Sequence, residues 1–393
     1  MKKSRLGALL VLGTTLLTSC DFLDNLNSLI PSVGTSGSNE SSVGVKVNEG
    51  GVEVPFSDGL VETADSLERT LAHESLGFSV SVPSLTTQST VVTYTNDVNA
   101  CSGDDNQSTA TASFLYKDFA LTNLTANVAV TGLGSVDGEA LLGSLNLAAE
   151  SATSSVKHVD LQNQPIGDDN GDNQYADLSG AVYLKGHDLY LDASNPSLRG
   201  VLGYLGSWLD HSLSLSEKTL FQDALGNLAS PVVTMRGLAD SLSSVMAIMQ
   251  ANPDLFTRYF SVTNYEDGTS LFHGTIGSNA LIKMASLFES AFTGSTYDAT
   301  YARLLNQYGS SSMQLALGLS FDATGLRQIQ INGNGLLVSN PSVEVVAISD
   351  TVTRNITTVE TFRFSGGLVA DLVYGDNVAV TIPEDLSAYE IYA

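Results

Sequence analysis

The stretch "TASFLYKDFALTNLTANVAVTGLG", residues 111–134, decides the fold because one period of two residues runs through most of it. Leu124, Ala126, Val128 and Val130 alternate with residues that are mainly polar. Successive side chains of a strand point to opposite faces, so this pattern places the apolar set on one face. The stretch therefore predicts a long, half-buried strand. The segment "EALLGSLNLAAESATSSVKHV" (139–159) predicts a second strand of the same kind.

The neighbouring segments extend these two strands into a sheet. Residues 58–75 carry leucines at helical spacing after Asp58, a possible cap, and predict a helix. Residues 78–84 and 89–95 then alternate as strands, and residues 176–194 predict a hairpin with its turn at 185–188. Long strands that follow one another in series favour a broad, curved antiparallel sheet.

The period changes after the hairpin. Residues 195–310 are mainly of helical period, including a segment at 214–229 with a capping box from Ser214 to Glu217, and one strand interrupts them at 269–277. Residues 311–383 return to the period of strands, and "NVAVTIPEDL" (377–386) predicts the last of these. We therefore expect a single α+β domain at 55–393, with first strands at 76–194, closing strands at 311–383, and an N-terminal helix. The sheet would be an unclosed half-barrel, with the helical insertion at 195–310 packed on its concave face.

The N-terminus has the pattern of a secretory leader. Lys2, Lys3 and Arg5 precede an apolar run of twelve residues, which is too short to span a bilayer as a helix. The run ends in "LTSC" (17–20), which resembles the bacterial lipobox. The resemblance implies that residues 1–19 are removed and that Cys20 carries the lipid that anchors the protein to the outer face of a cell membrane. The alternative is a plain secreted protein with a free thiol at Cys20.

Residues 20–54 separate this anchor from the domain. Residues 31–51 are rich in Ser, Gly and Asn, a composition typical of a flexible tether. A tether of this length has a mean reach of ~25 Å. The domain would then stay near the membrane without a fixed orientation.

Charge and cysteine content exclude several classes of function. The formal net charge is −25, and such a surface repels nucleic acid, so we expect no nucleic-acid partner. The second cysteine, Cys101, lies in the polar segment "NACSGDDNQS" (99–108) beside Asp104 and Asp105. A catalytic cysteine needs an electropositive setting, which these carboxylates oppose.

The order of the elements is similar to that of bacterial lipoproteins of the LolA, LolB and LppX/LprG type. Three phrases carry the resemblance: "LERTLAHESLGFSVSV" (67–82), "VYLKGHDLYLDAS" (182–194) and "VAVTIPED" (378–385). This chain is longer than one such domain, and its helical block is larger. In those families an unclosed sheet wraps over helices around an apolar cavity. The resemblance implies binding of a lipid or acyl chain without catalysis, and it assigns no catalytic residues or cofactor.

A lipid cleft between sheet and helices would need an apolar cavity of at least ~300 Å³. Apolar side chains in the helical block are the candidates for its lining: Leu205, Trp208, Leu209, Val245, Met246, Met249, Phe256 and Phe260. The alternative is that these side chains fill a solid core, which is the commoner outcome for apolar stripes at helical spacing. The protein would then be a structural or adhesive surface lipoprotein.

One acidic loop is a weak candidate for a metal site. Asp168, Asn170 and Asp172 have the spacing of positions 1, 3 and 5 of a calcium loop. Asn173 stands where that loop needs Gly, and Ser179 stands where it needs Glu, so a solvated loop is the favoured interpretation. Ser154 and Lys157 match SxxK by chance, since the partner motifs are missing. The five histidines are scattered, and we predict that the protein is not an enzyme.

Overall fold

The computed structural model describes residues 44–99, 109–167, 170–208, 215–225, 231–349 and 352–392. The leader, Cys20, most of the predicted tether and Cys101 lie outside the described residues. None of the helices within the described ranges combines the length and the apolar character that a membrane crossing requires.

The described residues form runs of strands separated by helices. The helices are α3 (Phe56–Leu71), α4 (Pro196–Trp208), α5 (Pro231–Ala251), α6 (Pro253–Phe256), α7 (Ser278–Thr293) and α8 (Tyr297–Tyr308). The strands are β1 (Val52–Val54), β2 (Ser75–Asn99), β3 (Thr109–Thr131), β4 (Leu142–Asp160), β5 (Gly171–Lys185), β6 (Asp188–Asp192), β7 (Lys218–Phe221), β8 (Phe260–Asn264), β9 (Ser270–Gly277), β10 (Ser312–Asp322), β11 (Gly325–Val338), β12 (Ser342–Ala347), β13 (Val352–Tyr374) and β14 (Glu390–Ile391).

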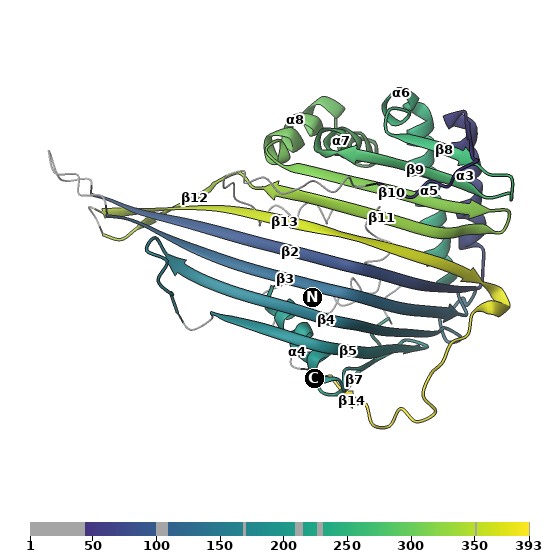
Figure 1. Cartoon of the computed structure of the whole chain (residues 1–393), viewed down its shortest axis with the longest axis horizontal. Coiled ribbons are helices and arrows are strands. Elements are labelled where there is room, and N and C mark those ends of the chain that lie inside the picture. The colour runs from purple at the N-terminus through teal and green to yellow at the C-terminus, as the bar shows by residue number, and fades with distance from the viewer. Residues whose placement is uncertain are drawn as a thin grey trace.

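All the strands belong to one sheet of 14 strands in the order β1-β8-β9-β10-β11-β13-β2-β3-β4-β5-β6-β7-β14, with β12 paired to β13 beside this path. Every pair is antiparallel except β14 with β7. Figure 1 shows the long strands β13, β2, β3 and β4 side by side across the molecule. The path has two free ends and does not close. The predicted α+β fold with an unclosed antiparallel sheet is therefore confirmed.

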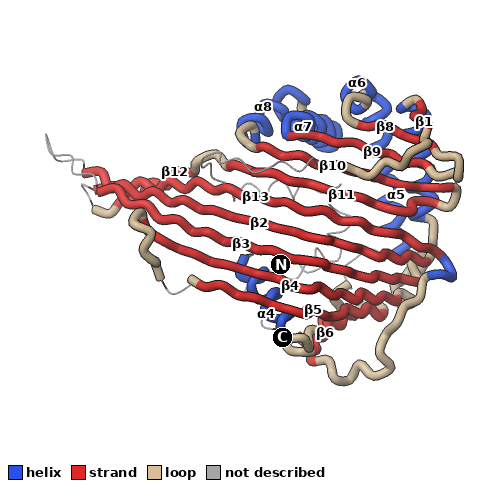
Figure 2. The backbone as a smooth tube through the Cα atoms, viewed as in Figure 1, coloured by secondary structure: helices blue, strands red, loops and turns tan. Residues whose placement is uncertain are grey.

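The helices pack on one face of the sheet, which we call the inner face. The main core lies there: α3, α5, α6 and α7 contribute buried side chains to one cluster with strands β8 to β11, β13 and the start of β2. A second cluster lies between α4 and strands β3, β4 and β5. Figure 2 shows α4 behind the lower strands of the sheet. The opposite, outer face is largely polar along β2, where Ser79, Ser81 and Thr86 alternate with the apolar set.

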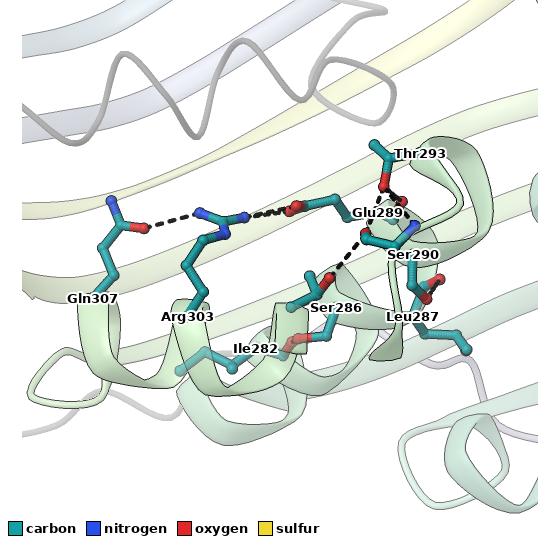
Figure 3. A network of polar contacts seen from close by, with 10 residues as sticks. Ile282, Ser286, Leu287, Glu289, Ser290, Thr293, Arg303 and Gln307 are labelled. Carbon is teal, nitrogen blue, oxygen red and sulfur yellow. Dashed lines mark hydrogen bonds and ion pairs between the residues drawn. The ribbon is translucent and has the colours of Figure 1, made fainter. Parts of the chain in front are cut away.

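Polar contacts join α8 to α7 (Figure 3). The Arg303 guanidinium donates two hydrogen bonds to the Glu289 carboxylate at 2.6 and 2.8 Å, and a third to Gln307 Oε1 at 3.2 Å. Ile282, Leu304 and Tyr308 form a small buried cluster between the two helices. The chain leaves α7 through Gly294 in the left-handed conformation, which glycine adopts more readily than residues with a Cβ.

The helical insertion is interleaved with the sheet. The predicted strand at 269–277 is confirmed as β9, but β7 and β8 also arise within 195–310 and join the sheet. The helix predicted for 214–229 is wrong over its described part. Lys218–Phe221 forms β7, which pairs with β6 and buries Thr219, and Glu217 forms an ion pair with Arg199 at 3.3 Å instead of capping a helix. Pairing with the free edge of β6 determines the structure of this segment more strongly than its local helical spacing does.

The last predicted strand, 377–386, is also wrong. β13 and β3 already occupy both edges of β2, so this segment cannot pair with β2. After β13 the chain forms one short 3₁₀ helix, Gly375–Asn377, and then runs without regular structure to the far end of the sheet, where β14 joins β7 (Figure 1). Tyr389 packs there edge-on against Tyr190, with Lys218 Nζ 5.5 Å from its ring centre. Burial is the main cause that raises the pKa of the Tyr389 hydroxyl to about 12.

Residues 44–54, the end of the segment predicted as a tether, lie against the domain. Val45 packs on Gly318 so closely that a Cβ on Gly318 would lie 2.5 Å from Val45 Cγ1. Asn332 Nδ2 donates to the Gly44 carbonyl at 2.8 Å. Gly318 and Asn332 belong to the outer face, since the residues next to them, Leu317 and Ile331, belong to the inner one. Val52–Val54 then forms β1 against β8.

The turn between β10 and β11 supplies a test of the fold in acid. Burial opposes ionisation of Asp322, but hydrogen bonds from Thr324 and Arg327 outweigh it and lower the pKa of Asp322 from 3.8 to about 2. A carboxyl group with a lowered pKa in the folded state stabilises the fold above its unfolded pKa, and this contribution disappears as the pH falls through the folded pKa.

We therefore expect Asp322→Asn to lower the free energy of unfolding at pH 7 by roughly 1–2 kcal/mol, and to have a much smaller effect near pH 2. Urea unfolding of both proteins between pH 2 and pH 7 measures this difference. An equal loss at every pH would show that the ionised carboxylate is not the stabilising group.

Candidate functional site

A row of extra residues crosses four strands of the sheet. The register between β13 and β2 shifts by one residue between Gly366 and Val369, so β2 holds one residue more than β13 at this point. The registers of β2 with β3, β3 with β4 and β4 with β5 are not shifted here. Pro83 therefore lies opposite Asn123, Asn123 opposite Glu150, and Glu150 opposite Asp177. An extra residue of this kind is a β-bulge. We call these four residues the bulge row.

The backbone of the bulge row is irregular for physical reasons. Asn123 and Asp177 have φ of 49° and 52°, in the left-handed region that Asn and Asp tolerate better than other residues with a Cβ. Pro83 has no N–H to donate to a neighbouring strand. The Asn123 side-chain amide donates to the Glu150 carboxylate, which ties β3 to β4 within the row.

The bulge row changes which residues of each strand face inward. On one side of it the inner face carries Leu85, Leu121 and Ala152, and on the other side it carries Leu124 and Leu147. The sequence number of the inward residues changes from odd to even along β3. A one-residue slip moves a whole apolar set to the other face, so the extra residue keeps both apolar sets on the inner face. The result is a continuous apolar floor on β2 to β5.

Helix α4 forms a roof over this floor. Asn195 caps its first turn, since Asn195 Oδ1 accepts from the Leu198 N–H at 3.0 Å. The Asn195 amide also donates to the Asp177 carbonyl at 2.8 Å, so the roof begins at the bulge row. Farther along α4, the Tyr204 hydroxyl donates to the Asp118 carbonyl at 2.9 Å, and its ring stacks on Phe119 with centroids 6.0 Å apart.

Two glycines allow α4 to approach the sheet. A Cβ at Gly180 on β5 would lie 2.2 Å from Leu198 Cδ2, and a Cβ at Gly200 on α4 would lie 2.3 Å from Tyr175 Cε1. Both distances are far below van der Waals contact. The absence of a side chain at these two positions therefore sets the height of the roof above β5.

Floor and roof enclose an apolar groove of about 340 Å³. This volume exceeds the ~300 Å³ typical of the smallest ligand sites. Strands β2 to β5 contribute Leu85, Thr87, Phe119, Leu121, Leu124, Leu147, Ala149 and Leu178, and α4 contributes Leu198, Val201, Leu202 and Leu205. Thr87 is the single polar residue of this lining, and no charged side chain belongs to it. The groove can accept hydrocarbon, but its lining offers no nucleophile and no acid–base pair.

The residues predicted to line a cavity fall in two places. Leu205 lines the groove, Trp208 ends α4 with its side chain outside the described part, and Leu209 lies outside the described residues. Val245, Met246, Met249, Phe256 and Phe260 pack in the main core, where the buried Phe260 ring stacks on Phe272 at 5.1 Å. The structure does not bring these two sets together.

From the sequence we did not predict that strands form the floor of the groove, although the sequence contains a pattern that indicates it. The inward set of β4 reads Leu145, Leu147, Ala149 and then Ala152, with a break in the alternation at Glu150. A similar break occurs between Leu121 and Leu124 in β3. Two breaks at paired positions of neighbouring strands indicate an aligned bulge.

In the described part of the predicted calcium loop, the candidate ligand oxygens accept hydrogen bonds from neighbouring residues. The Asn170 side-chain oxygen accepts from the His158 N–H, and Asp172 accepts from the Ser155 hydroxyl at 2.6 Å. Asp168 lies outside the described residues. Among the described residues, no group of three or more His, Cys, Asp or Glu side chains is placed to hold a metal ion.

Comparisons with known proteins give no family for this chain. No family model matches it, and no curated protein matches it. Among solved structures, a Pseudomonas aeruginosa FadL homologue is 8% identical with a TM-score of 0.15, over 82% of this chain and 99% of that one. The P. putida toluene transporter TodX is 6% identical with a TM-score of 0.12, over 82% and 95% of the two chains. Scores of this size do not indicate a shared fold.

The bulge row gives a prediction about stability. We expect Asn123→Val to lower the free energy of unfolding by roughly 1–2 kcal/mol, because a β-branched residue is strained at positive φ. Asn123→Gly also removes the hydrogen bond to Glu150 but relieves the backbone, so it should cost less than the valine.

Asn127→Val, on the outer face of the same strand, is the matched control. Asn127 is exposed in regular strand, where valine is favoured, so we expect no loss of stability. Denaturant unfolding of the three variants measures the difference. Equal effects at positions 123 and 127 would contradict a special backbone role for Asn123.

Proposed function

We propose that this protein binds a hydrophobic ligand, a lipid or an acyl chain, in the groove between α4 and strands β2 to β5. One observation carries the proposal: a groove of about 340 Å³ whose lining is apolar except for Thr87. Exposed apolar surface of this kind is costly in water, and the hydrophobic effect favours its burial by an apolar partner at roughly 25 cal/mol per Å².

The groove also differs from the main core of the same protein. In the main core, α3, α5, α6 and α7 together cover the strands, and side chains such as Phe256 and Phe321 are almost fully buried. Over β2 to β5, α4 is the one helix in the described part of the chain that covers the floor, and it leaves space. This contrast supports ligand binding over a purely structural role with a filled interior.

The predicted lipid on Cys20 would place this groove beside a membrane. We propose a lipid-anchored protein on the outer face of the cell membrane that holds its ligand without chemical conversion. The lining supplies no catalytic group, which fits binding alone. The similar element order in lipoproteins of the LolA, LolB and LppX/LprG type agrees with this role.

A fluorescent apolar probe tests the proposal. The full chain should carry Cys20→Ser, so that no lipid attached at residue 20 competes for the groove. We expect N-phenyl-1-naphthylamine to bind saturably with enhanced fluorescence. Leu205→Arg should weaken this binding at least about tenfold, because it brings an unpaired charge to an apolar wall.

Leu305→Arg is the matched control. Leu205 on α4 and Leu305 on α8 are both helical and similarly exposed, at 37% and 39%, but Leu305 is not part of the groove. The control should bind the probe as the parent does. No saturable binding by the parent, or equal binding by both arginine variants, would contradict the proposal.

A further inference from the structure

The apolar floor ends at a polar patch on the same inner face. Along β3, Phe119 and Leu121 line the groove, and Lys117 comes two residues earlier. The register of β3 with β2 is unbroken from Thr109 to Thr122, so Lys117 points to the same face as Phe119. Two residues of a strand span about 7 Å. Lys117 therefore lies one side-chain position beyond the apolar lining.

Lys117 is a cation that has no counter-ion among the described residues. The ion pairs among the described residues all use arginines, namely Arg199, Arg303, Arg327 and Arg354. Within the same part of the chain, Lys117 makes no hydrogen bond or ring contact either. It is half-buried between Ser89 on β2 and Val156 on β4. The chain has 42 acidic and 17 basic side chains, yet none of the described carboxylates pairs with this lysine.

A buried hydroxyl beside Lys117 also lacks a described hydrogen-bond partner. Ser154 on β4 lies directly opposite the groove residue Phe119 and next to Lys117 on the inner face. Ser154 is only 3% exposed, yet its Oγ has no hydrogen-bond partner within the described part of the chain. A buried hydroxyl without a partner costs about 1–3 kcal/mol, so a ligand oxygen that accepts from it would recover part of this cost.

We propose that the ligand is an acidic amphiphile. Its hydrocarbon chain lies in the groove, and its anionic headgroup accepts hydrogen bonds from Lys117 Nζ and Ser154 Oγ. This inference rests on the proposed function and adds the headgroup class to it. A carboxylate and a phosphate share the required chemistry: a negative oxygen within reach of an ammonium group and a hydroxyl.

Displacement of the apolar probe by matched competitors tests this assignment. Dodecanoate, dodecyl phosphate and dodecan-1-ol share one chain length and differ in headgroup. In the full chain with Cys20→Ser, we expect both anions to displace N-phenyl-1-naphthylamine at about tenfold lower concentration than the alcohol. The two anionic arms show whether a carboxylate or a phosphate is preferred.

Lys117→Met should remove this preference and leave displacement by the alcohol unchanged. Lys157→Met is the matched control: Lys157 lies on the adjacent strand but faces outward, where its amine donates to Asn163 at 2.9 Å. The control removes the same charge and should keep the preference. Ser154→Ala should weaken binding of the anions alone, by less than Lys117→Met does.

The outcomes separate the two proposals. Failure of all three competitors and of the probe to bind would overturn the proposed function itself. Saturable binding with equal potency of alcohol and anions would leave the groove as a hydrocarbon site and overturn the acidic headgroup. Loss of the preference in both lysine variants would assign it to overall charge and would also overturn the role of Lys117.

Discussion

The extra residue shared by β2, β3, β4 and β5 is the constraint on which the rest of this half of the molecule depends. Because the four extra residues lie opposite one another, each strand pair keeps its register while every strand changes which of its side chains face inward. A bulge in one strand alone would disrupt its pairing with the next. The shared row instead lets long strands expose one continuous apolar surface.

Helix α4 depends on the same row. Its capping residue Asn195 bonds to the carbonyl of Asp177, which is the member of the row on β5. The roof of the groove is therefore positioned by the irregularity that makes the floor. Its 13 residues give a length of about 20 Å, whereas strands of 15–25 residues extend over roughly 50–80 Å. Among the described elements, this one helix covers only part of the floor, and the groove lies where its cover is incomplete.

Periodicity in the sequence was sufficient for the class of the fold and for the long strands. Alternation in residues 111–134 and 139–159 corresponds to β3 and β4, and the hairpin at 176–194 corresponds to β5 and β6 with their turn at Gly186. Short elements failed because their state depends on distant partners. Lys218–Phe221 has a local helical spacing but becomes a strand because β6 offers an edge, while residues 377–386 alternate but pair with no strand.

The site was harder to predict than the fold for a related reason. Apolar helical stripes such as that of Met246 and Met249 satisfy the same pattern whether they fill a core or line a cavity, and here they fill the core. The groove lining comes mainly from strands, and its distinctive residues, Lys117 and Ser154, are ordinary in sequence. Their significance arises only from register, which places Ser154 opposite Phe119 and Lys117 between Ser89 and Val156.

The two ends of the strand path have a consequence for solubility. The path ends in its two shortest strands, β1 with three residues and β14 with two, contributed by segments close to the two ends of the described chain. Long, flat edge strands offer rows of unpaired N–H and C=O groups that recruit other chains and lead to aggregation. Here the last strand at each end leaves a template of only two or three residues. Each end of the path therefore offers a second molecule only a short edge on which to add.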